Sequence, residues 1–325
     1  MQNILILGTG KMARNIGLFF LRQDRAVSWV SRDSDRAASF HHQLVKDIRR
    51  LALVLDKESD DFNVDVADIS YIPLKKYDLI LESIEEDLTQ KQEVIKNINP
   101  LLTSDTILTS NSSSILPNQI HNSAIGLHFF YPVELTGLVE VITNSEVNEE
   151  KIKQLINQLK SWGIHTIIQN NNNAFAINRL LLPMQAEAFR LLQAGYPVRV
   201  INECSKSDQI KIGQLELMDS IGFDVLLPAI RNYVSRMSAI DQKNYEGLIT
   251  GLEALIKIGK LGKKNGNGLL AGDPLPWQLN DPCLKDIDPL KQRFSQIFIN
   301  TCQRFLESAQ IKKEELKNVL DTLFS

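Results

Sequence analysis

The amino-acid sequence predicts an α/β protein in which a doubly wound parallel sheet is followed by an all-α domain. Three observations lead to this prediction: short apolar runs alternate with helical stretches over residues 1–173, a glycine-rich turn follows the first apolar run, and long helical stretches dominate residues 174–325. Parallel strands need helical crossovers, which cover both faces of the sheet, so this alternation is typical of a doubly wound arrangement. We therefore expect a first domain at residues 1–173 and a second at residues 174–325.

The first domain is expected to open with a βαβ unit. Residues 3–7 (NILIL) form a continuous apolar run, as expected for a strand buried on both faces, and residues 26–30 form a second run after the helical stretch 15–22. A charged helical stretch at 33–56 and a polar loop follow. Further strands are expected at residues 77–81, 106–109 and 124–128. The polar run 169–173 (QNNNN) predicts a solvent-exposed turn or linker that ends the domain.

The second domain is expected to contain mainly helices, at residues 178–194, 198–205, 218–237 and 248–258. Residues 177–195 also resemble residues 291–309 at a constant offset. The matched positions are Arg179, Arg190 and Leu192 against Arg293, Arg304 and Leu306. Three identities are compatible with chance. If the repeat is real, residues 174–270 are its main copy and residues 290–325 a partial second copy with a role in packing.

Composition and charge narrow the class of function. Of the 325 residues, 43% are hydrophobic and 23% charged, which is ordinary for a globular protein, and 36 basic and 39 acidic residues are mixed along the chain. We therefore expect no nucleic-acid or membrane partner. The three cysteines form no CxxC motif and no histidine lies at metal-ligand spacing, so neither a disulfide framework nor a metal site is expected. The short first apolar run is unlike a signal peptide, and we expect a cytoplasmic protein.

A glycine motif lies between the first expected strand and the first expected helix. Its sequence, Gly8-Thr9-Gly10-Lys11-Met12-Ala13, matches the dinucleotide-binding fingerprint G-x-G-x-x-(G/A) of Rossmann domains. The first glycine allows the tight turn, the second lets the backbone approach the pyrophosphate, and the alanine keeps helix and sheet close. The helix N-terminus then binds phosphate. We expect cofactor contacts from the loop at Gly8, Thr9, Gly10, Lys11 and Met12.

The end of the second expected strand bears on the choice between NAD and NADP. Enzymes that use NAD usually carry an acidic residue here for the ribose 2′-hydroxyl, whereas this chain has Ser31 followed by Arg32. This pair would suit a 2′-phosphate. Alternatively, Arg32 is solvated and Asp33 or Asp35 reaches the ribose. NAD and NADP remain nearly equal alternatives, with NADP slightly favoured.

Four further segments resemble one family, in sequence and in order. They are residues 78–94 (DLILESIEEDLTQKQEV), 107–117 (ILTSNSSSILP), 126–142 (GLHFFYPVELTGLVEVI) and 175–183 (FAINRLLLP). Together they resemble the 3-hydroxyacyl-CoA dehydrogenase family, which includes 3-hydroxybutyryl-CoA dehydrogenases, and the likeness extends from Gly8 to about Gly268. The resemblance implies an oxidoreductase that interconverts a (3S)-3-hydroxyacyl-CoA and a 3-oxoacyl-CoA by hydride transfer to or from NAD(P).

The resemblance assigns a catalytic pair, His128 and Glu140. Oxidation of a secondary alcohol needs a base for the hydroxyl proton, and imidazole is the side chain that titrates near neutral pH. A carboxylate that accepts a hydrogen bond from the other ring nitrogen fixes the tautomer and stabilises the imidazolium. A lone histidine beside Phe129 and Phe130 is more often a core residue, but the matched Glu140 favours the catalytic interpretation.

The resemblance also implies polar contacts around the reacting carbon. Ser113 and Asn178 match the family's two substrate contacts, and Glu86 and Lys91 match positions near the nicotinamide ribose. Each has an ordinary structural alternative. Ser113 is one of several loop hydroxyls, Asn178 could cap the helix that follows, and Glu86 and Lys91 could form a surface pair.

Binding of coenzyme A rests on weaker signals. Lys46, Arg49 and Arg50 have the spacing of one helix face and could meet its phosphates, although a solvated basic face is equally compatible. The family's prolines are missing from residues 207–224, and its helical hairpin is longer than residues 33–77 allow. These departures leave the acyl-chain length open, and even whether the substrate carries CoA.

Two other functions therefore stay open. One is a dehydrogenase of a free 3-hydroxy acid or a related alcohol, such as gulonate or carnitine. The other is a catalytically silent NAD(P)-binding sensor or scaffold, against which the complete set of catalytic residues argues. The family often forms dimers through its helical domain, so we expect either a homodimer or a chain whose second copy takes the place of a partner.

Overall fold

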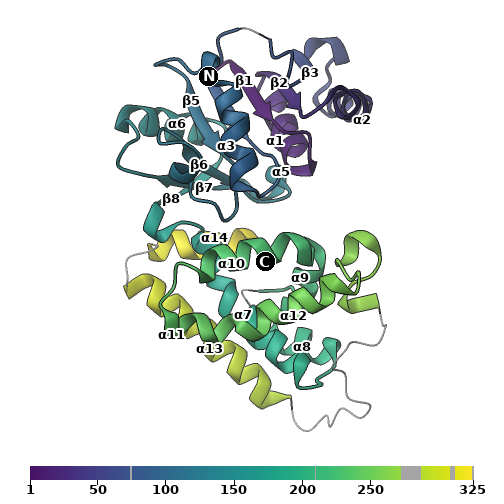
Figure 1. Ribbon diagram of the computed structural model, residues 1–325, viewed down its shortest axis with the longest axis vertical. Coiled ribbons are helices and arrows are strands. Elements are labelled where there is room, and N and C mark those ends of the chain that lie inside the picture. Colours follow the sequence, from purple (N-terminus) through teal and green to yellow (C-terminus); the bar gives the residue numbers. More distant parts are fainter. Residues whose placement is uncertain (74, 209, 272–286, 308–311, 324–325) are drawn as a thin grey trace. The chain divides into compact units, whose positions relative to one another are not determined.

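The computed structural model describes residues 1–325 except 74, 209, 272–286, 308–311 and 324–325 (Figure 1). It divides into two compact units, Met1–Ala174 and Phe175–Ser325. The first is a sheet with helices on both faces, and the second is helical. The predicted fold class, a doubly wound α/β domain followed by an all-α domain, is confirmed.

The first unit contains an eight-stranded sheet in the order β3-β2-β1-β4-β5-β6-β7-β8. Its strands are β1 Asn3–Leu7, β2 Ala26–Ser31, β3 Val64–Asp68, β4 Leu79–Glu82, β5 Ile107–Ser110, β6 Ile125–Phe129, β7 Leu138–Thr143 and β8 His165–Asn170. All neighbouring pairs are parallel except β6 and β7, which are antiparallel. The strand order reverses between β1 and β4, where doubly wound sheets bind their ligands.

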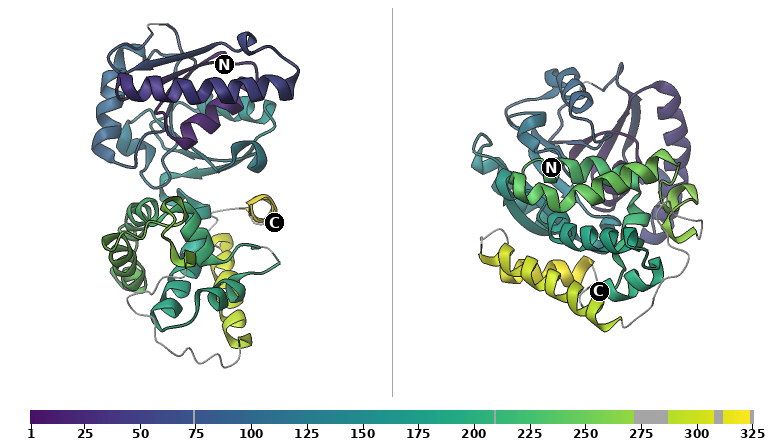
Figure 2. Two further views of the ribbon diagram at one scale, coloured as in Figure 1. Left: turned by 90° about the vertical axis from the view of Figure 1, so that its right-hand side faces the viewer. Right: turned by 60° about the horizontal axis from the view of Figure 1, so that its bottom comes forward.

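Helices cover both faces of this sheet, and α2 runs along one of them (Figure 2). The helices are α1 Lys11–Arg22, α2 Ser34–Leu55, α3 Leu88–Asn97, α4 Pro117–Ile120, α5 Val133–Thr136 and α6 Glu149–Ser161. The short 3-10 turns are η1 Ser59–Asp61, η2 Asn99–Leu101 and η3 Asn171–Asn173.

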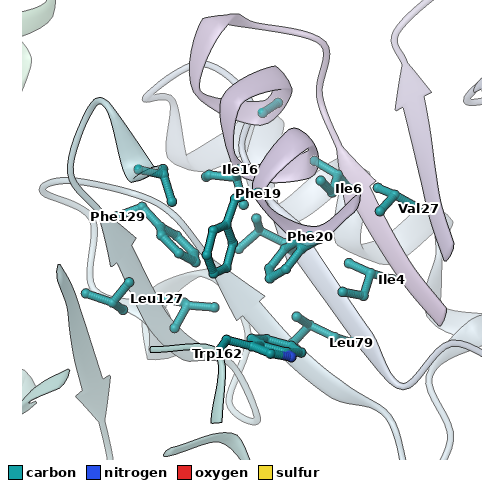
Figure 3. Close-up of a cluster of buried hydrophobic side chains, with 14 of the residues drawn as sticks. Ile4, Ile6, Ile16, Phe19, Phe20, Val27, Leu79, Leu127, Phe129 and Trp162 are labelled. Carbon is teal, nitrogen blue, oxygen red and sulfur yellow. The ribbon is translucent and has the colours of Figure 1, made fainter. Parts of the chain in front are cut away.

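Two hydrophobic clusters lie on the two faces of the sheet. Ile4 and Ile6 of β1 belong to the cluster around α1 (Figure 3), whereas Leu5 and Leu7 belong to the cluster beside α3. In a strand, successive side chains point to opposite faces. A strand covered on both faces must therefore be apolar throughout, which is why β1 was readable in the sequence.

Two edge regions differ from the sequence prediction. The polar loop expected after α2 contains β3 (VDVAD), whose residues are all only partly buried and which pairs with β2 alone. The run 169–173 is not only a solvent-exposed turn, because Gln169 and Asn170 complete β8 and Gln169 is buried. An edge strand exposes one side and tolerates polar residues, so the apolar signal that marks a central strand is absent.

The second unit contains helices and turns throughout its described part. Its helices are α7 Ala176–Gln193, α8 Val198–Ser205, α9 Gln214–Ile221, α10 Phe223–Val234, α11 Ala239–Gln242, α12 Glu246–Lys257, α13 Asp288–Glu307 and α14 Lys313–Leu323. The 3-10 turns are η4 Lys243–Tyr245, η5 Lys263–Asn265 and η6 Leu269–Ala271. No helix in the described ranges is both long and apolar enough to cross a membrane.

The helix expected at residues 218–237 is two helices. Gly222 separates α9 from α10 with a φ of +100°, a conformation that residues with a side chain rarely adopt. Asp219 of α9 accepts a hydrogen bond from the backbone N–H of Leu269, and a Cβ on Gly268 would lie 2.0 Å from the Asp219 carboxylate. The chain therefore breaks here to receive the loop that returns after α12.

The two similar segments of the second unit are in contact, because α7 and α13 lie side by side (Figures 1 and 2). The buried Glu187 of α7 binds both Arg190 on its own helix and Arg293 on α13. At the other end, the guanidinium of Arg179 lies over the ring of Phe305. The matched arginines of the two helices line one cavity of about 710 Å³. Helix α13 thus packs against α7.

Candidate active site

The glycine loop joins β1 to α1 in a form that fits a dinucleotide. Gly8 has a φ of +122°, and a Cβ there would lie 2.4 Å from the carbonyl oxygen of Ser83, so only glycine fits. A Cβ on Gly10 would meet nothing within 4 Å, and Gly10 begins α1 without a side-chain cap. The N–H groups at the start of α1 are therefore accessible to a phosphate, and the loop fits a pyrophosphate.

Helix α1 lies unusually close to β2. The indole N–H of Trp29 donates to the carbonyl oxygen of Ala13 at 3.1 Å, and a Cβ on Gly17 would lie 1.9 Å from the Trp29 ring. Gly17 was not predicted from the sequence, although its place one helical turn after Ala13 was a usable signal. Of the other loop residues, Met12 packs partly into the core and the Lys11 ammonium lies 3.8 Å above the centroid of the Tyr131 ring.

Ser31 and Arg32 end β2, beside the N-terminus of α2. Ser31 is 1% exposed, and its hydroxyl has no hydrogen-bond partner among the described residues. Arg32 is half exposed, 3.8 Å from the carboxylate of Asp33. Asp33 caps α2 by accepting from the backbone N–H of Arg36 at 2.9 Å. Asp33, one of the two alternative ribose ligands, is thus already hydrogen-bonded to its own helix.

His128 and Glu140 face each other across the antiparallel pair β6 and β7. Nδ1 of His128 lies 3.2 Å from Oε2 of Glu140, and the two residues are 6% and 0% exposed. The ring of Phe130 lies 4.5 Å from the imidazole, centroid to centroid. A buried carboxylate next to Nδ1 favours the tautomer that donates to it, so Nε2 is the nitrogen suited to exchange a proton with substrate.

Ser113 lies in a serine loop that follows β5, the strand beside β6. The loop is held by Glu86, whose Oε1 accepts hydrogen bonds from the backbone N–H groups of Ser113 at 3.1 Å and Ser114 at 2.8 Å and from the Ser112 hydroxyl at 2.7 Å. Burial disfavours the charged form of Glu86, but Lys91 and the serine donors outweigh it, so the pKa of Glu86 lies below its ordinary value. Glu86 is therefore ionised at neutral pH.

Glu86 and Lys91 do not form a surface pair, so that alternative was wrong. Lys91 is 1% exposed, and its ammonium contacts the Glu82 carboxylate at 2.7 Å, the carbonyl oxygen of Ile84 at 3.3 Å and the Glu86 carboxylate at 3.5 Å. Contacts of Glu86 and Lys91 with a nicotinamide ribose stay a prediction. Glu82 was missed in the sequence, where it reads as the last residue of an apolar strand.

Asn178 lies in the second unit, so its meeting with His128 also stays a prediction. The capping alternative was wrong, because α7 begins at Ala176 and its N-cap is Phe175. The side-chain amide of Asn178 instead donates to the hydroxyl of the buried Tyr233 at 2.9 Å. This hydrogen bond holds the amide in one orientation.

The basic face of α2 lines a cavity of about 600 Å³ beside β3. Lys46 and Arg49 belong to its wall together with His41 and His42. Arg50 does not line it, because its side chain is 82% exposed and lies beside Asp47. Two of the three residues predicted to meet phosphate groups are thus brought together.

Comparisons with known proteins agree with this picture. The family model for the NAD binding domain of 3-hydroxyacyl-CoA dehydrogenase matches residues 3–172, and that for the C-terminal domain matches residues 175–272. The α subunits of two fatty acid oxidation complexes are similar: that of Idiomarina loihiensis is 28% identical over 76% of this chain and 36% of its own length, and that of Aliivibrio fischeri 31% over 61% and 30%. The chain thus spans about a third of these relatives.

Solved structures share the fold. The 3-hydroxybutyryl-CoA dehydrogenase of Escherichia coli has a TM-score of 0.70 at 22% identity and covers 88% of this chain and 62% of its own. The (S)-3-hydroxybutyryl-CoA dehydrogenase PaaH1 of Ralstonia eutropha has the same TM-score at 24% identity, over 83% of this chain and 98% of its own. The likeness reaches across both units.

Proposed function

Because the chain belongs to the 3-hydroxyacyl-CoA dehydrogenase family, we propose that it interconverts a (3S)-3-hydroxyacyl-CoA and a 3-oxoacyl-CoA, with NAD(P) as the hydride carrier. The observation that carries the proposal is the buried His128–Glu140 pair at 3.2 Å. A histidine held in one tautomer by a carboxylate is suited to exchange a proton with an alcohol. The open glycine loop of the same unit would place a dinucleotide at the carboxyl ends of the strands.

The proton and the hydride leave different atoms of the substrate. A nicotinamide, when bound, supplies the hydride acceptor for the C3–H bond. His128 takes the hydroxyl proton on Nε2 while the C3–O double bond forms, and the neutral imidazole becomes imidazolium. The Glu140 carboxylate at Nδ1 stabilises this new charge. Ser113 and Asn178 would donate hydrogen bonds to the oxygen on C3.

The cavity beside α2 suits the phosphates of coenzyme A. Lys46 and Arg49 provide positive charge on one wall, and His41 adds a ring that can stack or donate. Arg50 is not needed for this contact. Exchanging Lys46 and Arg49 for glutamine should raise KM for acetoacetyl-CoA, whereas the same exchange at Arg50 should leave KM unchanged.

NADP is the cofactor favoured by the end of β2. A buried hydroxyl without a partner is unfavourable, and a 2′-phosphate would accept a hydrogen bond from Ser31 and bind the guanidinium of Arg32. Arg36, the third residue of α2, adds positive charge. Asp33, the nearest carboxylate, is engaged as the cap of α2.

The activity is tested by following NAD(P)H absorbance with acetoacetyl-CoA. We expect turnover by the wild type, a loss of about 10²-fold or more in kcat for His128→Ala, and no change for His165→Ala, an exposed histidine on β8. Turnover of free 3-oxo acids but not of the thioester would replace the proposal by the free-acid dehydrogenase. Absence of turnover with every substrate, alongside measurable NAD(P)H binding, would favour the silent sensor.

Of the two alternatives for assembly, we propose that the protein is a monomer. Helix α13 packs along α7, and its Arg293 binds the buried Glu187, so this face of α7 is covered within one chain. Light scattering should therefore give the mass of a monomer, and the mass of a dimer would restore the homodimer alternative.

A further inference from the structure

Glu82 is a fully buried carboxylate at the point where the strand order of the sheet reverses. It is the last residue of β4 and lies between Leu7 of β1 and Ser110 of β5. Its exposed fraction is 0%. A buried carboxylate is strongly unfavourable unless it is paired and hydrogen-bonded. Its position and its burial together call for an explanation that the apolar pattern of β4 does not provide.

Three donors converge on this carboxylate. Oε1 accepts hydrogen bonds from the Lys91 ammonium at 2.7 Å and from the backbone N–H of Ile84 at 2.8 Å. Oε2 accepts from the Ser110 hydroxyl at 2.5 Å. The Ser110 hydroxyl in turn accepts from the backbone N–H of Ser112 at 3.2 Å. Glu82 is therefore tied to α3 through one oxygen and to the start of the serine loop through the other.

A second set of contacts, formed by charged side chains, connects Glu82 to the serine loop. Lys91 lies between two carboxylates, 2.7 Å from that of Glu82 and 3.5 Å from that of Glu86. Glu86 holds the backbone N–H groups of Ser113 and Ser114 on one oxygen. The chain of contacts runs Glu82–Lys91–Glu86–Ser113, and one ammonium serves two carboxylates. If Glu82 loses its charge, Lys91 is free to move toward Glu86, and the oxygen that organises the loop moves with it.

We propose that Glu82 is a positioning residue, which acts through Lys91 and Ser110 to fix the serine loop and with it the Ser113 hydroxyl. The inference rests on the proposed function for the role of Ser113 in the reaction. It assigns Lys91 to the same task, as the charge that joins two carboxylates. Small displacements of groups that orient a substrate are costly in rate. Glu82 therefore controls turnover without touching the reacting atoms.

Two variants distinguish a positioning role of Glu82 from a purely structural role of the Glu82–Lys91 ion pair. Glu82→Gln removes the charge and leaves Lys91 buried opposite a neutral amide, so it should also lower stability. Glu82→Gln combined with Lys91→Met removes both charges and should recover much of that stability, because neutral replacement of a buried pair is often tolerated. In the double variant, however, Glu86 has lost the ammonium that fixes it.

The experiment measures three quantities for both variants: kcat with acetoacetyl-CoA, the Kd of NADPH or NADH by fluorescence, and amide hydrogen exchange of the peptide spanning residues 110–116. We expect kcat to fall between about tenfold and a hundredfold in both variants and the loop amides to exchange faster. The cofactor Kd should change less than about threefold in Glu82→Gln, which leaves Lys91 in place. Glu85→Gln is the matched control, because Glu85 is exposed on the same turn. Its values should equal those of the wild type.

Two results overturn the inference. If the double variant regains thermal stability and wild-type kcat together, the pair is only structural. If its loop amides exchange as slowly as in the wild type, Glu82 does not hold the loop. A wild type without turnover on any substrate is a separate failure, that of the proposed function. Hydrogen exchange, which needs no activity, then decides the positioning role by itself.

Discussion

Replacing Glu140 by glutamine isolates the contribution of its charge to turnover. Glutamine has nearly the same volume, and its carbonyl oxygen can still accept a hydrogen bond from Nδ1 of His128. What is lost is the negative charge, 3.2 Å from a ring that becomes positive during the reaction. Because Glu140 is fully buried, solvent screens this interaction little.

The size of the effect follows from the type of hydrogen bond. A hydrogen bond to a charged group contributes about 1.5 to 3 kcal/mol, against about 1 kcal/mol for a neutral one. The charge-specific part is therefore about 0.5 to 2 kcal/mol, which corresponds to a loss of about twofold to thirtyfold in kcat. The interaction strengthens only as the imidazolium forms, so kcat should fall while KM changes little.

Steady-state kinetics with acetoacetyl-CoA and NADPH or NADH provide the measurement. Glu146→Gln is the control, because Glu146 is exposed shortly after β7. An unchanged kcat in Glu140→Gln would refute the orienting and stabilising role of this carboxylate. A rise in KM with unchanged kcat would instead assign Glu140 to ground-state binding.

Three further predictions concern the cofactor, the serine loop and the helical unit. Arg32→Ala should raise KM for NADPH by about tenfold and leave KM for NADH unchanged, and a strong preference of the wild type for NADH would contradict the assignment. Glu86 has a lowered pKa, so its contribution to stability is present above the ordinary value of 4.5 and is lost as pH falls through the lower folded value. In urea unfolding at a series of pH values, the stability gap between wild type and Glu86→Gln should therefore close below pH 4.5, and a gap that stays constant would contradict this. Glu187→Gln should lower the free energy of unfolding by about 1 to 3 kcal/mol, because one buried carboxylate holds two arginines. Glu253→Gln, which breaks an exposed pair, should cost less than about 1 kcal/mol by the same thermal or urea assay, and equal losses would show that burial of Glu187 has no effect.

The sequence predicts those parts of the fold that follow a periodic burial pattern. β1 is apolar from Ile4 to Leu7 because these side chains enter both hydrophobic clusters. β3 and β8 lie at the two edges of the sheet and contain several polar residues, so neither shows the continuous apolar run of a central strand. The break at Gly222 depends on packing against a loop from far along the chain, which no local pattern records.

The residues of the candidate site also differ in how far the sequence predicts them. The glycine loop was predicted because a strand–helix turn fixes the spacing of its residues. The His128–Glu140 pair was implied by the family resemblance, and two adjacent antiparallel strands hold it together. The Glu82–Lys91 pair was not found. Lys91 lies on a helix whose other charges are exposed, and what buries it is the contact of α3 with the end of β4, together with Ser110 on the neighbouring strand. Burial of a charge is thus a tertiary property.

The single antiparallel step of the described sheet explains why the His128–Glu140 pair can form where the other candidate site residues lie. The glycine loop and the serine loop follow the carboxyl ends of parallel strands, and Glu82 is the last residue of such a strand. All three therefore lie at the same end of the sheet. Glu140 is near the start of β7, and if β7 were parallel to β6 it would lie toward the opposite end of the sheet. Because β7 runs against β6, its third residue meets His128, the next-to-last residue of β6. The reversal therefore brings a buried carboxylate to the end of the sheet where the glycine loop lies and where we propose that the proton is transferred.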